Sequence, residues 1–217
     1  MGEMEKRRID MGAYARREHF RYFCGMGYPY VGLTHTVDVT AFVKRTKEAG
    51  FPFFLTFLWC AAKAANQVPE LRQRIEEGEI VEFSACPTSN TVAKPDGTYC
   101  YCALYCDKPL AQFIPYAVER QKQSREQGGI HEEGTDSLPM FFISSMPWLS
   151  YTALVQPVPS PADSNPRITW GKYERQGERL LMPVSILCHH GLVDGLHIAR
   201  FYENLEHVLS TCIDESL

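Results

Sequence analysis

The longest apolar run in the chain, at positions 51–62, limits the choice of fold more than any other feature of the sequence. It stops at Lys63, well short of the ~20 apolar residues that a membrane-spanning helix needs. The segment from Pro52 to Gln67 is apolar on most sides of a helix, which is typical of a helix enclosed by a protein core. Val68 precedes a proline and disfavours further helix. The run therefore predicts a buried helix in a globular protein.

Length and composition are those of a single globular domain. The chain has 217 residues, of which 45% are hydrophobic and 22% are charged, an ordinary balance for a protein with a sizeable core. No proline-rich linker divides two cores, so residues 1–217 are expected to form one domain. Nucleic-acid-binding domains usually carry a basic surface, whereas this chain has a net charge of −4. The charged N-terminal segment has no apolar stretch behind it, so we expect no secretory signal, no nucleic-acid partner and no membrane partner.

The eight cysteines indicate a reducing compartment. Disulfide frameworks are typical of short secreted chains, and this chain is neither short nor marked for secretion. We therefore expect reduced thiols in a cytoplasmic protein. Cys100, Cys102 and Cys106 have even spacings that fit one face of a strand. Because no second cysteine pair with zinc-ligand spacing follows, they are interpreted as small apolar strand residues, and no metal is predicted.

Hydrophobic periodicity and turn residues divide the chain into mixed elements. Helices are predicted at 40–50, 52–67, 110–127 and 194–209, with a short helical turn at 71–75. Strands are predicted at 34–40, 80–83, 89–93, 98–106, 140–146, 167–174 and 180–188. Because helices and strands mix without strict alternation, we predict an α+β fold, a two-layer α/β sandwich with a mixed β-sheet packed by helices.

The segment 188–195 carries the sharpest chemical signal, since it joins an apolar strand to an amphipathic helix. Histidine is the side chain best suited to proton transfer near neutral pH. His189 and His190 are adjacent on a strand and face opposite ways, so at most one enters a given cleft. The residues alone leave two interpretations open, a proton-transfer site or locally bonded histidines with Asp194 as a simple helix cap. A metal site that also includes His197 matches no zinc spacing.

The sequence resembles a known family at this point. His190-Gly-Leu-Val-Asp194-Gly195 resembles the HxxxDG motif of CoA-dependent acyltransferases, and 180–201 resembles the C-terminal segment of type A chloramphenicol acetyltransferases. Further ordered matches to that family lie at 16–20, 66–72, 78–81, 143–148 and 168–173. Together with the similar length, they extend the resemblance over nearly the whole chain and imply a CoA-dependent acyltransferase-like fold.

The resemblance assigns roles to five residues. It implies that His190 is the general base, which removes a proton from the acceptor hydroxyl so that the oxygen attacks the acetyl-CoA thioester directly. It implies that Ser144 donates a hydrogen bond to the oxyanion of the tetrahedral intermediate. Thr169 matches a threonine that helps to bind the intermediate through water. Asp194 matches an aspartate that pairs with an N-terminal arginine, here Arg16, and so orders the loop.

The resemblance also implies ligand-binding residues. Trp148 matches a tryptophan along the CoA tunnel, although its type alone would also suit a core position. The stretch 51–54 lacks the lysine that the family carries near the CoA phosphates, which leaves Lys172 as the candidate cation. The acceptor pocket of the family is lined by aromatic residues, whose plausible counterparts here are Tyr22, Phe23 and Tyr99.

The expected function is O-acetylation of chloramphenicol by acetyl-CoA, an antibiotic-inactivating reaction. Stretches 25–30 and 155–166 depart from the family pattern, which leaves a different hydroxyl acceptor open. Two further functions fit the same fold. One is a dihydrolipoyl acyltransferase core, although the chain has no room for the lipoyl and linker segments of such a protein. The other is a non-catalytic small-molecule binder.

The resemblance further implies a homotrimer with its active sites between subunits. The 12 phenylalanines, 11 tyrosines and 3 tryptophans fit such contacts.

Overall fold

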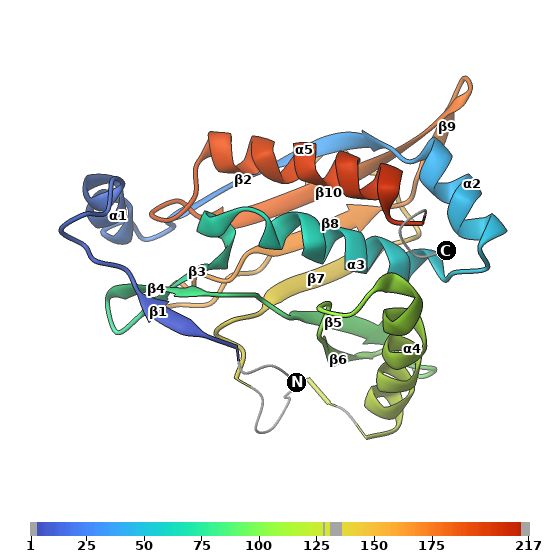
Figure 1. Cartoon of the computed structure of the whole chain (residues 1–217), viewed down its shortest axis with the longest axis horizontal. Helices are drawn as coiled ribbons and strands as arrows, with labels where there is room; N and C mark the ends of the chain where they lie inside the picture. Colours follow the sequence, from blue (N-terminus) through green and yellow to red (C-terminus); the bar gives the residue numbers. More distant parts are fainter. Residues whose placement is uncertain (1–3, 128, 131–135, 214–217) are drawn as a thin grey trace.

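The computed structural model describes residues 4–127, 129–130 and 136–213, and a mixed β-sheet lies at its centre (Figure 1). Within these residues the sheet has seven strands, in the order β2-β10-β8-β7-β5-β6, with β9 paired to β10. The strands are β2 (Tyr30–Asp38), β5 (Thr88–Ala93), β6 (Tyr99–Leu104), β7 (Phe141–Met146), β8 (Arg167–Gly171), β9 (Glu174–Gln176) and β10 (Arg179–His189). β7 runs parallel to β5 and β8, and the other pairs are antiparallel. The predicted mixed sheet is confirmed.

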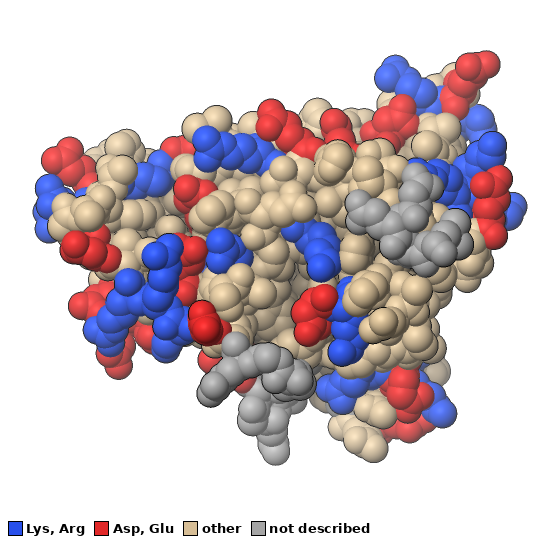
Figure 2. Space-filling view, viewed as in Figure 1, with Lys and Arg blue, Asp and Glu red and all other residues tan. Residues whose placement is uncertain are grey.

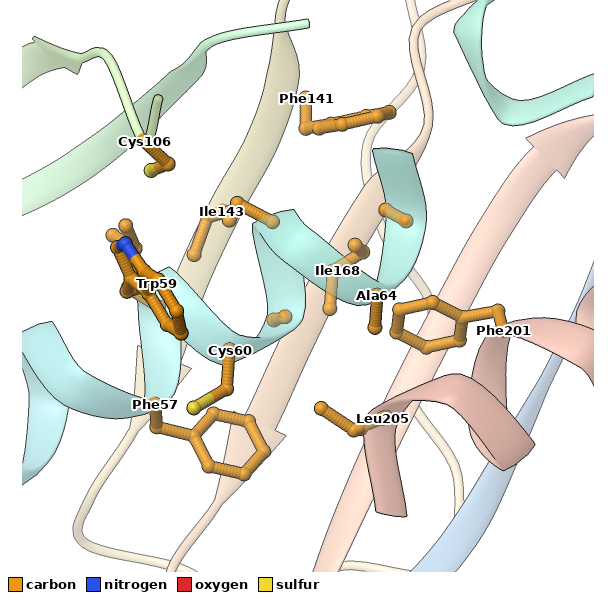
Figure 3. Packing of buried hydrophobic residues seen from close by; sticks show 14 of the residues in the cluster. Phe57, Trp59, Cys60, Ala64, Cys106, Phe141, Ile143, Ile168, Phe201 and Leu205 are labelled. Carbon is orange, nitrogen blue, oxygen red and sulfur yellow. The ribbon is translucent and has the colours of Figure 1, made fainter. Parts of the chain in front are cut away.

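Within the described residues, four helices pack against one face of this sheet or along its border (Figure 1). They are α2 (Thr40–Glu48), α3 (Phe53–Asn66), α4 (Leu110–Gln127) and α5 (Gly195–Thr211), whereas α1 (Arg17–Cys24) lies beyond the end of the sheet. α3 is the predicted buried helix, and every residue from 55 to 62 on it is buried. Figure 3 shows its side chains packed among Ile143 and Ile168 of the sheet and Phe201 and Leu205 of α5. No helix in the described ranges is long and apolar enough to cross a bilayer.

A small second sheet corrects one prediction. It contains β1 (Lys6–Arg8), β4 (Glu79–Phe83) and β3 (Gln73–Glu76), in that order. The helical turn expected at 71–75 is instead a 3₁₀ turn, η1 (Pro69–Arg72), followed by β3. Pairing with β4 supplies the backbone hydrogen bonds of β3, and such tertiary pairing overrides local preference. Charges of both signs are interspersed over the face drawn in Figure 2, and across this sheet Lys6 pairs with Glu76 at 2.9 Å.

Two strand boundaries also differ from the predictions. The segment expected as one strand at 167–174 is divided into β8 and β9, and β9 pairs only at the outer part of β10. β6 ends at Leu104, so Cys106 lies beyond the strand on which Cys100 and Cys102 are buried. All eight cysteines fall within the described ranges, and none of them is in a disulfide there.

The second face of the sheet carries a row of hydroxyl groups. Ser144 of β7 is in register with Thr169 of β8, and Thr169 with Ser185 of β10. Ser185 is in turn in register with Thr34 of β2, and their hydroxyl oxygens lie 2.7 Å apart. Because side chains alternate along a strand, these residues share the face opposite to the apolar residues beneath the helices.

The segment 147–166, between β7 and β8, lies against part of this second face. The Tyr151 hydroxyl donates to the carbonyl oxygen of Thr169 at 2.9 Å. The Ser185 hydroxyl donates to the Tyr151 hydroxyl oxygen at 3.2 Å. A Cβ at Gly171 would lie 2.7 Å from the Leu149 carbonyl oxygen, so glycine permits this close approach. The segment thereby forms one wall over the hydroxyl row.

Arg74 of β3 is fully buried and joins the small sheet to the start of β7. Its guanidinium donates to the carbonyl oxygens of Leu71, Gln73, Leu138, Pro139 and Met140 at 2.7–3.1 Å. Burial lowers the pKa of the guanidinium. The five carbonyl oxygens supply the polar surroundings that a buried charge requires.

Candidate active site

The loop between β10 and α5 holds His190 in a defined orientation. The backbone N–H of His190 donates to Pro29 O at 2.7 Å, and Nδ1 lies 2.8 Å from Val193 O. A carbonyl oxygen only accepts hydrogen bonds, so Nδ1 carries the proton and Nε2 keeps a free lone pair. Phe23 of α1 stacks on the imidazole, with ring centroids 3.8 Å apart and 23° between the planes. His190 is therefore fixed to the loop through Nδ1, and Nε2 is the ring nitrogen turned away from the Val193 carbonyl.

His189 has different surroundings and a different character. It is 3% exposed, and its Nδ1 accepts the Gly191 N–H at 3.2 Å. Burial lowers its pKa to about 4, against the opposing effect of Asp163. The ring stays neutral near neutral pH, so His189 is a packed structural group and a poor proton carrier there.

Arg16 and Asp194, which the resemblance pairs, do form an ion pair. A second guanidinium nitrogen of Arg16 donates to His190 O at 3.2 Å, so the arginine bridges both ends of the loop. Asp194 also caps α5, accepting the Leu196 N–H at 3.0 Å. Burial raises the pKa of Asp194, but the Arg16 guanidinium and the Leu196 N–H, which both bond to the carboxylate, help to hold the pKa below its usual value. The loop is thus tied down by a carboxylate that stays ionised at neutral pH.

Ser144 and Thr169 lie elsewhere, in the wall of a cavity of about 1250 Å³. The hydroxyl oxygens of Ser144 and Thr91 are 3.2 Å apart, and the Thr169 hydroxyl donates to Gln156 Oε1 at 3.3 Å. Tyr99 and Trp148 line the same cavity and are 48% and 75% exposed. Trp148 is therefore no core residue. A cavity of this size suits a ligand of drug size or larger.

Within this chain the two groups of residues do not meet. Ser144 is in register with Ser185 through Thr169, and His190 lies five positions beyond Ser185 along the chain. At ~3.3 Å per residue, this offset is on the order of 15 Å along the strand direction, before two strand spacings are added. His190 is also not among the residues that line the cavity. No single acceptor hydroxyl can therefore contact both His190 and Ser144 of this chain.

The remaining predicted ligand residues are divided between these places. Tyr22 is 67% exposed and packs edge-on against Phe23, beside His190. Lys172 is exposed, follows β8, and donates its backbone N–H to Leu149 O at 2.8 Å. It does not line the cavity.

Sequence reasoning missed Thr91 and Gln156, the two side chains that contact Ser144 and Thr169. Thr91 could have been found from the alternation of the strand at 89–93, which turns it toward the same face as Ser144. Gln156 lies in the irregular, proline-punctuated segment, where no periodicity indicates which residues face the sheet.

Comparisons with known proteins identify the class from the fold. The solved cubic core of the pyruvate dehydrogenase multienzyme complex, 22% identical, superimposes with a TM-score of 0.65 over 91% of this chain and 88% of that chain. A solved chloramphenicol acetyltransferase superimposes with a TM-score of 0.87 over 94% of this chain and 100% of the other, at 26% identity. The fold is that of a CoA-dependent acyltransferase core, as predicted.

Sequence comparison then gives the family. The family model described as chloramphenicol acetyltransferase matches residues 4–206. "Chloramphenicol acetyltransferase 3" of Escherichia coli is 27% identical over 96% of this chain and 99% of its own length. The chain belongs to the chloramphenicol acetyltransferase family. The predictions of this family and of an acyltransferase enzyme are confirmed.

Proposed function

We propose that the protein transfers an acetyl group from acetyl-CoA to a hydroxyl of chloramphenicol, with His190 as general base. The observation that carries this proposal is the hydrogen bond from His190 Nδ1 to Val193 O, which makes Nε2 the basic nitrogen of the neutral ring. A neutral imidazole with a free nitrogen is the group that a weakly acidic hydroxyl needs at neutral pH. The names and coverage of the relatives support the acceptor and the acetyl group.

The proposed reaction needs one base and one oxyanion donor. His190 Nε2 takes the proton of the acceptor hydroxyl while its oxygen attacks the thioester carbonyl carbon. The oxyanion that forms accepts a hydrogen bond from the Ser144 hydroxyl, with Thr169 beside it. Collapse of the intermediate breaks the carbon–sulfur bond, and the leaving CoA thiolate takes the proton back from the imidazolium. Asp194 and Arg16 hold the loop and do not exchange protons.

The separation of His190 from Ser144 supports a site shared between subunits. We propose a homotrimer in which His190 and Phe23 of one subunit face the Ser144 cavity of the next. A repeated contact between two different surfaces closes into a ring when the rotation is three-fold. Such a ring would bring each base to a neighbouring cavity.

The ligand contacts complete the proposal. Trp148 and Lys172 are proposed to contact CoA, and Tyr22, Phe23 and Tyr99 to contact the acceptor. A cytoplasmic location follows from the use of acetyl-CoA and agrees with the eight free thiols.

A thiol-release assay with acetyl-CoA tests the reaction. Fast release with chloramphenicol is the expected result. Slow release with chloramphenicol but fast release with another hydroxyl compound would change the acceptor, and release only with dihydrolipoamide would change the class of acceptor. If no acceptor gave thiol release, the proposal would be overturned, and the protein would be interpreted as a non-catalytic small-molecule binder.

Mixing two inactive variants tests the shared site. His190→Ala removes the base, and Tyr99→Arg places a charged side chain in the cavity. Refolded together, they are expected to regain part of the activity, because some sites combine an intact base with an intact cavity. A monomeric mass by light scattering, or a mixed trimer without recovered activity, would contradict the arrangement.

A further inference from the structure

Behind the His190 loop, His197 of α5 lies close to Glu70 of η1. His197 is 6% exposed, and its Nε2 lies 3.5 Å from Glu70 Oε1. The other oxygen of Glu70 is buried without a hydrogen-bond partner in the described part of the chain. The proposed reaction gives neither residue a role. Their contacts lead from Glu70 through His197 to the Asp194 backbone, and this connection suggests what they do.

His197 is the acceptor for the backbone N–H of Asp194, with 3.1 Å between that nitrogen and Nδ1. This contact completes a capping box at the start of α5, in which histidine fills the place usually taken by Glu or Gln. Since Nδ1 accepts, the ring proton of neutral His197 is on Nε2, the nitrogen that faces Glu70. Glu70 therefore favours the one tautomer that can serve the Asp194 N–H.

The protonation state of His197 follows from its surroundings. Its Nδ1 also lies 3.0 Å from Asp194 Oδ1, a distance that would suit a protonated ring. Burial lowers the pKa of His197, Arg16 and Arg200 act with burial, and Glu70 and Asp194 oppose it. A protonated Nδ1 would also leave the Asp194 N–H without its acceptor. The neutral ring is the form that accepts the Asp194 N–H at Nδ1.

One peptide group links His197 to His190. The N–H of Asp194 and the C=O of Val193 belong to the same peptide unit, which is planar and moves as one body. Its N–H donates to His197, and its C=O accepts from His190 Nδ1 at 2.8 Å. A rotation of this peptide would break both bonds, so the two imidazoles are mechanically joined. Hydrogen bonds in such a chain also polarise one another.

We propose that His197 and Glu70 are positioning residues, which hold His190 in its base-competent tautomer through the Val193–Asp194 peptide. This inference rests on the proposed function, because it assumes that His190 is the base. His197 and Glu70 act only through the peptide and touch no substrate. Their effect is to keep the Val193 carbonyl aimed at His190 Nδ1, so that Nε2 remains the unprotonated nitrogen.

Two matched pairs of variants test this role. His197→Leu removes the acceptor for the Asp194 N–H, whereas His197→Asn keeps an oxygen near the position of Nδ1. Glu70→Leu removes the partner of Nε2, whereas Glu70→Gln keeps an oxygen there. We expect each leucine variant to lower kcat by ~10-fold or more, with KM changed by less than about 3-fold, because misplacing a reacting group is costly. The asparagine and glutamine variants are expected to recover most of the loss.

The second readout needs no substrate. In protein labelled with ¹⁵N-histidine, the ring nitrogen shifts report which nitrogen of His190 is protonated, and the spectrum of His190→Gln assigns the signals. Wild-type His190 is expected to be protonated at Nδ1 alone, and the leucine variants to give a mixture of tautomers. The readout therefore stays informative even if chloramphenicol is not the acceptor.

The outcomes separate the possibilities. A folded His197→Leu protein with an unchanged His190 tautomer and unchanged kcat would overturn the positioning role. The role would also be overturned if His197→Leu and His197→Asn lost kcat equally and in proportion to their loss of thermal stability. A residue that only stabilises the fold would give that result. Wild-type turnover and the His190→Ala variant test the proposed function separately.

Discussion

The His190 loop and the Ser144 cavity lie on the same sheet but are built in opposite ways. In the loop, Arg16, Asp194, His197 and His190 each bond to one another or to the backbone through at least one side-chain atom. In the cavity, Ser144 and Thr169 have one side-chain partner each among the described residues and border a large open volume. The loop is preorganised by the protein itself, whereas the cavity keeps hydrogen-bonding capacity for a ligand.

This difference suits the two roles proposed. A base must be presented in one protonation state and one orientation before substrate arrives, and dense bonding provides this. An oxyanion donor must be free to bond to charge that exists only in the transition state. Changes in the loop are therefore expected to act through orientation, and changes in the cavity through direct contact with ligand.

Replacing the base should give the largest effect. His190→Ala is expected to lower turnover by ~10²–10⁴-fold, the usual contribution of a general base, with the fold unchanged. The measurement is kcat by thiol release, with circular dichroism to check folding. His189→Ala is the matched control and should be milder in kcat, because its buried ring has no proton-transfer role. Equal loss in both variants would undo the assignment of the base.

Replacing the oxyanion donor should have the next largest effect. Ser144→Ala is expected to lower kcat by ~10²–10³-fold with little change in KM, because the hydroxyl acts on transition-state charge. Steady-state kinetics with both substrates separate the two constants. A raised KM with unchanged kcat would instead make Ser144 a binding residue.

Protonation of His189 should weaken the fold in acid. Its pKa is about 4 in the folded protein because of burial, against an ordinary value of 6.5. As the pH falls, the ring is protonated at a higher pH in the unfolded chain than in the folded protein. The contribution of His189 to stability is therefore full above pH 6.5 and falls as the pH drops toward 4. The loss is on the order of 1–3 kcal/mol. The loss is measured by denaturant unfolding of the wild-type protein and of His189→Gln at several pH values. If the free energy of unfolding depended on pH in the same way in both proteins, the expectation would be contradicted.

The stacked ring over the base should give the smallest effect. Phe23→Leu keeps an apolar contact on His190 but removes the aromatic pair, which is worth ~0.5–1.5 kcal/mol. We expect kcat to fall by about 2–10-fold, roughly the rate equivalent of that energy. A loss as large as that of His190→Ala would mean that Phe23 contributes more than support to the ring.

The apolar elements of the fold could be predicted because burial determines their sequence. α3, α5 and β10 show their buried residues as runs or at regular spacing. β1 and α1 show no such signal. Every residue of β1 is charged and exposed, and it is a strand because it pairs with β4. In α1 only Phe20 is buried, so its position depends on contacts from elsewhere in the chain.

The candidate site could be predicted in part. The motif around His190 and the resemblance indicate the residues, but spacing along the chain could not reveal which of them share a cavity. The separation of His190 from Ser144 follows from strand register, which depends on pairings distant in sequence. From sequence, His197 suggests at most a metal ligand, because a capping histidine has no pattern that distinguishes it from any other.

The fully buried Arg74 has a consequence for how the chain assembles. Its charge is acceptable only when carbonyl groups from both sides of it, at 71–73 and 138–140, are in place. A partly folded molecule with one group and not the other would enclose a guanidinium with too few acceptors, a state of high free energy. Arg74 therefore makes the docking of the small sheet onto the start of β7 close to all-or-none, and half-assembled chains are disfavoured before they can accumulate.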